Sequence, residues 1–90
     1  MKCRKISASA IRKEIRRMKK VHPTAWRRVK ADVKQKCGRF SEKMVIDYAL
    51  GKVQKDYERL ELGCPSAGAL FEVAIETPEH GMCKYGRKKK

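Results

Sequence analysis

Four cysteines and two histidines are the side chains of this 90-residue chain with the most chemistry to offer. Zinc modules usually place ligands in pairs, about two to four residues apart, and the sequence has one such pair, His80 and Cys83. Cys37 and Cys64 would complete a set of three cysteines and one histidine, each arriving alone from a separate segment, and Cys3 is a further candidate. Because a second close pair is missing, we predict no metal site and no cofactor. Zinc held by these residues is the weaker alternative.

The cysteines are expected to be thiols or metal ligands before disulfides. The first ten residues are basic and are not followed by the apolar run that a signal peptide needs. A reducing, cytoplasmic location is therefore the default expectation. Cys37 continues an apolar helical stripe and fits a small buried hydrophobe, whereas Cys64 stands between Gly63 and Pro65, which suits a tight turn.

The sequence gives little indication of a catalytic site. A cysteine nucleophile needs a base within hydrogen-bond reach, and nothing ties His22 or His80 to a thiol. Asp47, Glu58 and Glu61 share one side of a predicted helix, where a solvated charged face is the ordinary interpretation. The phosphate-binding pattern GxxxxGK[ST] does not occur. We therefore predict that the protein is not an enzyme.

The charges are sharply segregated along the chain. Residues 1–40 hold fifteen of the 24 Lys and Arg residues against two acids, residues 41–83 are net negative by four, and residues 84–90 add five bases. A formal net charge of +14 is costly through self-repulsion and favours contact with something negative. At 41% apolar residues, the chain still has enough hydrophobic content for one compact domain.

Helical periodicity accounts for most of the chain. Apolar residues recur at helical spacing over residues 8–21 and 23–37, and a longer helix with a wide apolar face is predicted from residue 41 to about 62. Pro23 ends the first helix because it disfavours helical geometry in the residue before it. Gly38 ends the second because Gly adopts the left-handed conformation at little cost. Short hydroxyl side chains stand where the N-caps are expected, at Ser7 or Ser9, Ser41 and Ser66.

Residues 66–77 fit two kinds of element. A helix capped by Ser66 matches the apolar spacing, but Phe71, Val73 and Ile75 also alternate as a strand would and could pair with residues 82–85. We predict an all-α fold, a three-helix core over residues 8–62 plus a fourth C-terminal helix. The alternative is a C-terminal β-hairpin that would make the fold α+β. Residues 84–90 are predicted to be a flexible basic tail.

The two basic helices predict a nucleic-acid-binding surface, because neutralising phosphates releases condensed counterions largely independently of base sequence. The predicted contacts are Arg12, Lys13, Arg16, Arg17, Lys19, Lys20, Arg27, Arg28, Lys30 and Lys34. Trp26 shares the apolar stripe of the second helix, so core packing is favoured for it over base stacking. DNA and RNA are equally consistent with this pattern. A helix-turn-helix is disfavoured, because the third helix is net acidic and a recognition helix should carry donors toward DNA.

Two alternatives use the same features differently. In the first, a basic helical face docks onto an acidic protein partner, so that the protein acts as a small inhibitor or adaptor, for example as a phage or mobile-element accessory protein. The acidic middle of the chain could also pair with the basic half of a second copy and form a homodimer. Membrane-surface binding through residues 8–21 ranks last, because that apolar stripe is narrow and lacks Trp or Phe. No stretch approaches the ~20 apolar residues of a membrane span.

Overall fold

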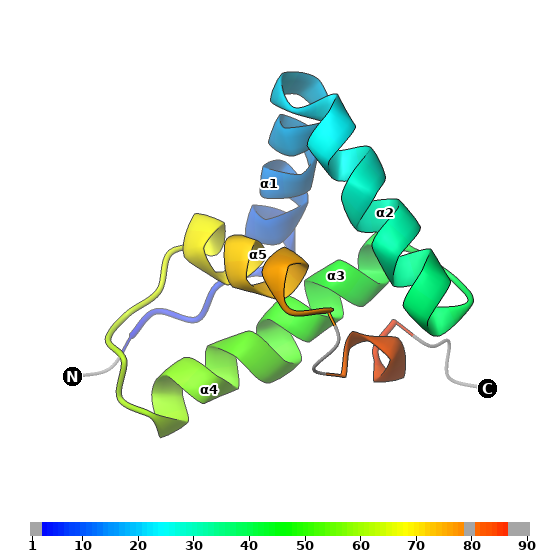
Figure 1. The fold of residues 1–90 in the computed structure, drawn as a ribbon. Coiled ribbons are helices and arrows are strands. Elements are labelled where there is room, and N and C mark those ends of the chain that lie inside the picture. The colour runs from blue at the N-terminus through cyan, green and yellow to red at the C-terminus, as the bar shows by residue number, and fades with distance from the viewer. Residues whose placement is uncertain (1–2, 79–80, 87–90) are drawn as a thin grey trace.

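Two helical arms lie over a long helical rod in the computed structural model, which describes residues 3–78 and 81–86 (Figure 1). The chain is all-α as predicted, and the described residues contain no strand. Its elements, in order, are α1 (Ala8–Val21), α2 (Pro23–Cys37), α3 (Glu42–Tyr48), the π-helical turn η1 (Ala49–Val53), α4 (Gln54–Arg59), α5 (Ala67–Glu76) and the 3-10 turn η3 (Met82–Lys84).

The bounds of α1 and α2 follow from local sequence signals. Of the two possible caps, Ser7 is the one used, and its Oγ accepts a hydrogen bond from the backbone N–H of Ala10 at 3.2 Å. His22 alone separates the two helices, and Pro23 begins α2, where its missing N–H costs nothing. Gly38 ends α2 at a φ of 75°. The predicted boundaries of both helices are therefore confirmed.

The long helix of the rod runs through α3, η1 and α4 and ends earlier than predicted. Leu62 N–H donates to the carbonyl of Tyr57 at 3.0 Å, which closes the helix with a Schellman-type turn. That turn places Glu61 at a φ of 52°, a left-handed position at which Gly is usual. The helix therefore stops at Arg59 instead of continuing to about residue 62.

The ambiguous segment is helical. Ser66 caps α5 by accepting from the N–H of Ala69 at 3.1 Å, as expected of a helix. Residues Leu70, Phe71 and Ala74 are buried, so the face at helical spacing and not the alternating face enters the core. Met82–Lys84 form a 3-10 turn. The β-hairpin alternative is therefore wrong.

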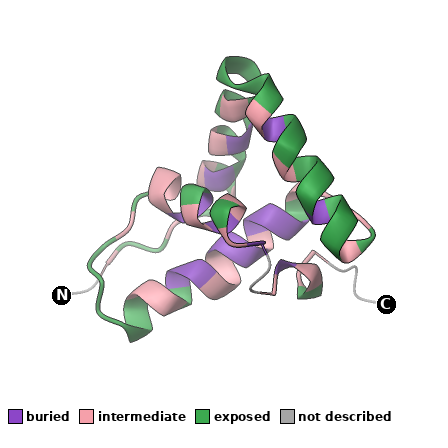
Figure 2. Cartoon of the chain, viewed as in Figure 1, coloured by how far each residue is buried: buried purple, intermediate pink, exposed green. Residues whose placement is uncertain are grey.

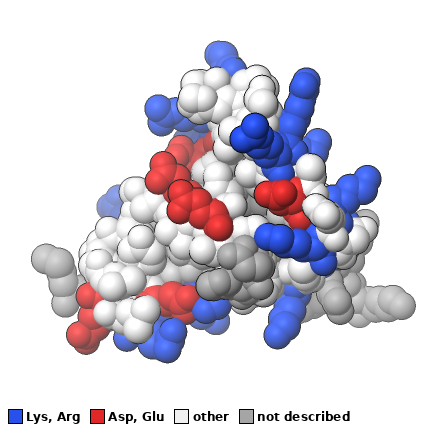
Figure 3. Space-filling view, viewed as in Figure 1, with Lys and Arg blue, Asp and Glu red and all other residues white. Residues whose placement is uncertain are grey.

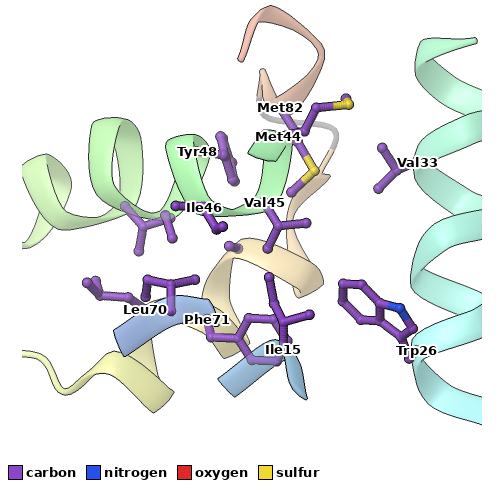
Figure 4. Close-up of a cluster of buried hydrophobic side chains, with 14 residues drawn as sticks. Ile15, Trp26, Val33, Met44, Val45, Ile46, Tyr48, Leu70, Phe71 and Met82 are labelled. Carbon is purple, nitrogen blue, oxygen red and sulfur yellow. The ribbon is translucent and has the colours of Figure 1, made fainter. Parts of the chain in front are cut away.

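The core lies where the arms meet the rod. Figure 4 shows Val33 of α2 on the side of Met44 of α3, and Trp26 of α2 pointing toward Phe71 of α5 and Ile15 of α1. Ile15, Val33, Met44 and Val45 have no exposed surface. The rod supplies the largest share of these side chains, as its wide apolar face predicted. By contrast, α2 buries two residues, and most of its surface is open to solvent (Figure 2).

All four cysteines are paired in disulfides, Cys3 with Cys64 and Cys37 with Cys83. The prediction of thiols or metal ligands is therefore wrong for the described candidates Cys3, Cys37, Cys64 and Cys83; the fourth ligand of that set, His80, lies outside the described residues. The pairing could not be predicted because the bonded cysteines are far apart along the chain. The partners are 61 and 46 residues apart in sequence, with Cα–Cα distances of 5.3 and 5.2 Å, and no local spacing reports such a contact.

The segment after α5 folds back onto the rod. Met82 is fully buried, and the Tyr85 ring packs edge-on against Tyr48 at a centroid distance of 5.6 Å. A Cβ at Gly51 would come within 2.8 Å of the Tyr85 ring, so the absence of a side chain in η1 makes room for Tyr85. The expected tail of residues 84–90 thus begins inside a packed turn, and residues 87–90 lie outside the described residues.

Candidate nucleic-acid interface

The cations of α1 occupy the side of the helix opposite its core contacts. Ile11 and Ile15 are four residues apart and have no exposed surface. Arg12, Arg16 and Lys20 form a second row at four-residue spacing, and all three are exposed. Lys13 and Arg17 form a third exposed row beside it. These five cations of α1 therefore share one broad solvent-facing surface.

The cations of α2 divide into two groups. Arg27, Lys30 and Lys34 recur at spacings of three and four residues, so they follow one face of the helix, and all are exposed. Arg28 lies on a different face, where it lines an open hollow of about 620 Å³ together with Glu76 of α5. The first group and the rows of α1 define what we call the basic ridge: Arg12, Lys13, Arg16, Arg17, Lys20, Arg27, Lys30 and Lys34.

Lys19 differs from the rest of the predicted set. Its Nζ pairs with the Glu42 carboxylate in the first turn of α3 and stands 5.9 Å from the centre of the Trp26 ring. It therefore ties α1 to the rod and to α2. Within the described part of the chain, Lys19 is the one predicted contact that forms an ion pair. We therefore exclude both Lys19 and Arg28 from the basic ridge.

On the face shown in Figure 3, the Lys and Arg side chains around α1 and α2 do not gather into one flat patch. Figure 3 shows Lys and Arg side chains projecting outward around α1 and α2, with acidic side chains between them and near α5. A second set of Lys and Arg side chains lies along the lower edge, below the rod. A long polyanion would meet these cations along the exposed sides of α1 and α2.

Trp26 is a core residue. It is 4% exposed, and its ring lies 5.6 Å from Phe40 and 6.3 Å from Phe71 between ring centres. A base has no access to a ring face covered in this way. The preference for core packing is therefore confirmed. Any stacking contact with nucleic acid must come from another aromatic side chain.

Among the described residues considered for metal binding or catalysis, the cysteines meet only as the two disulfide pairs. Among residues 3–78 and 81–86, no group of three or more His, Cys, Asp or Glu side chains is arranged to hold a metal ion. His22 is exposed at the corner between α1 and α2, at the opposite end of α2 from Cys37. Asp47 makes an ion pair with Lys43, one turn away on α3. Glu58 and Glu61 instead line a second hollow, at the far end of the rod.

Two residues with clear structural roles escaped the sequence analysis. Arg39 donates from Nη2 to the carbonyls of Cys83 and Tyr85, at 3.0 and 2.8 Å, and so fixes the C-terminal segment beside the end of α2. Gln54, the first residue of α4, is 8% exposed and lines the second hollow. No sequence signal identifies Arg39, because its acceptors are backbone atoms more than forty positions away. The burial of Gln54 was not expected either, because glutamine is mostly exposed in proteins.

No protein-family model, no curated protein and no solved structure matches this chain. No helix in the described ranges has the length and apolar character required to cross a membrane. The charge distribution and the surface geometry are therefore the features of this chain that bear on its function.

Proposed function

We propose that this protein is a small nucleic-acid-binding protein, regulatory or architectural, that contacts phosphate backbones through the basic ridge and carries out no reaction. The observation that supports the proposal most is the exposure of every member of the ridge on two helices whose opposite faces build the core. Such a surface is rigid, and it keeps its cations available for phosphate. Counterion release then drives binding with little dependence on sequence.

The two disulfides bear on where the protein works. Disulfides persist in oxidising compartments and in the cytoplasm of hyperthermophiles, and they are rare in other cytosols. A cytoplasmic location remains a prediction, and we restrict it to a cytoplasm in which disulfides survive. If both cysteine pairs are found as free thiols in an extract of the native host, this restriction is wrong.

Fluorescence anisotropy with short duplexes of DNA and of RNA, titrated with salt, tests the function. The slope of log affinity against log salt should be steep, because each phosphate contact on duplex DNA contributes roughly 0.9 to it. The double variant Arg27→Glu/Lys30→Glu should lower both the affinity and this slope. Lys55→Glu/Arg59→Glu, which makes the same change in net charge on α4, should lower affinity much less.

Circular dichroism shows whether both double variants keep their helices. Equal losses in the two variants would mean that total charge, and not the basic ridge, governs binding. No binding to any duplex or single strand at low salt would reject the proposal. A homodimer by light scattering, or capture of an acidic protein, would then favour the alternative role as an interaction module.

A further inference from the structure

A second hollow, of about 650 Å³, lies at the end of the molecule away from the corner between α1 and α2. Its floor is one face of α4 and of the turn that follows, made by Gln54, Tyr57, Glu58 and Glu61 at spacings of three and four residues. The N-terminal segment forms the opposite wall, and Figure 1 shows that segment running beside the loop between α4 and α5. This volume is within the range of small-ligand sites, roughly 300–1,000 Å³.

Gln54 is the feature that indicates a ligand. The residue is more than nine-tenths buried, yet its side-chain amide makes no hydrogen bond to the described residues. No buried side-chain nitrogen or oxygen in the described part of the chain is both sealed from solvent and without a partner. At least part of the amide of Gln54 therefore reaches solvent, and the residue lines the hollow. A buried amide left open to a hollow presents one donor side by side with one acceptor.

The two walls of the hollow carry charges of opposite sign. Arg4 and Lys5 are exposed on the N-terminal side, and Glu58 and Glu61 are exposed on the α4 side. A ligand that matches this polarity is anionic at one end and offers hydrogen-bond donors at the other. Half-buried Tyr57 adds an aromatic surface between the two ends.

We propose that this hollow binds an unpaired nucleotide of a single-stranded nucleic acid. Every base carries a donor beside an acceptor on an edge, which suits the amide of Gln54, and exocyclic amino groups suit the carboxylates. Tyr57 supplies a stacking surface, which single-strand-binding proteins use without regard to base identity. Arg4 and Lys5 hold the phosphate.

This inference rests on the proposed function and specifies its substrate, because the chain links the hollow to the basic ridge. Lys5 precedes α1 by three residues, and Arg12 and Lys13 lie in the second turn of that helix. A strand that follows the ridge along α1 toward its N-terminus reaches the Arg4 and Lys5 wall of the hollow. One nucleotide turned out of the strand then fills it.

The test compares a single strand with a duplex at one salt concentration. Gln54→Leu keeps the size of the buried side chain, and Tyr57→Leu removes the aromatic ring. Each should weaken binding to the single strand roughly tenfold, as loss of one base contact does, and leave the duplex unaffected. Gln35→Ala, an exposed glutamine on α2, is the matched control and should change neither.

Nuclear magnetic resonance of the unmodified protein tests nucleotide binding in the hollow without a substitution that could disturb the fold. Adenosine monophosphate should shift the side-chain amide signals of Gln54 and leave those of Gln35 in place. The reversed-charge variant Arg27→Glu/Lys30→Glu should keep this response even though it binds duplex poorly, which separates the hollow from the ridge.

Three results would overturn the inference. If the wild type and Gln54→Leu bind the single strand with equal affinity and bind duplex normally, the proposed function is retained and the hollow is rejected as a nucleotide site. Shifts of Gln54 caused by a capped dipeptide and not by the nucleotide would assign the hollow to a peptide. An unchanged Gln54 signal with both probes would mean that the amide is only hydrated.

Discussion

Cys37, the last residue of α2, is bonded to Cys83 in the 3-10 turn that follows α5, across 46 residues of sequence. The same turn carries fully buried Met82, and Arg39 donates to the carbonyls of Cys83 and Tyr85. The most exposed helix of the fold is thereby attached to the C-terminal segment at its end, whereas Trp26 and Val33 attach it along its length. The basic surface of α2 depends on these few anchors.

Removal of either disulfide should destabilise the domain by a similar amount. The loops they close differ little in length, and the chain-entropy model then gives about 4 kcal/mol for each. Urea unfolding of Cys37→Ser/Cys83→Ser and of Cys3→Ser/Cys64→Ser measures this. Because Cys64 is exposed, a thiol reductant should cleave the Cys3–Cys64 disulfide before the Cys37–Cys83 disulfide. Cleavage of Cys37–Cys83 first would contradict this order.

Trp26→Ala should cost about 3–5 kcal/mol of unfolding free energy, since it leaves a cavity between α2, Phe40 and Phe71 of α5. The fraction of protein that remains folded should bind nucleic acid as before, because the ring is covered by Phe40 and Phe71. Trp26→Phe serves as the control and should recover most of the stability. A large loss of affinity at full folding would show that the ring contacts the ligand.

Arg27→Glu and Arg28→Glu make the same charge change at adjacent positions and should have different effects. Arg27 belongs to the face shared with Lys30 and Lys34, whereas Arg28 lines the hollow beside Glu76. We expect the salt slope of duplex binding to fall by about one phosphate contact for Arg27→Glu and to change less for Arg28→Glu. Indistinguishable slopes would mean that the ligand does not follow the basic ridge.

Asp56 should contribute to stability at neutral pH and lose that contribution in acid. The hydrogen bond from Lys52 Nζ at 2.7 Å, supported by Arg59, holds the pKa of this carboxyl below its ordinary value of 3.8. A lowered folded-state pKa stabilises the fold above the unfolded value, and the gain disappears as pH falls through the folded value. Asp56→Asn should therefore be slightly less stable at neutral pH and less sensitive to acid. Melting temperatures from about pH 2 to pH 7 test this, and parallel profiles for both proteins would refute it.

Local signals were sufficient for most of the helical framework. Ser7, Ser41 and Ser66 each cap a helix, and Gly38 ends one, because caps and turns depend on residues within one helical turn of the site. The end of the long helix was misplaced, because Glu61 adopts a left-handed conformation that a glutamate does not predict. The C-terminal segment was ambiguous because its apolar residues fit both periodicities.

The sequence by itself determined the helices, their apolar faces and the concentration of positive charge in the first forty residues, since each depends on neighbours along the chain. The tertiary structure alone decided how the cysteines pair, that Lys19 forms an ion pair with Glu42, and that Gln54 borders a hollow. Those outcomes depend on groups brought together from distant positions, such as Cys3 with Cys64 or Lys19 with Glu42. Contacts of this kind are set by how the helices pack and leave no regular spacing in the sequence.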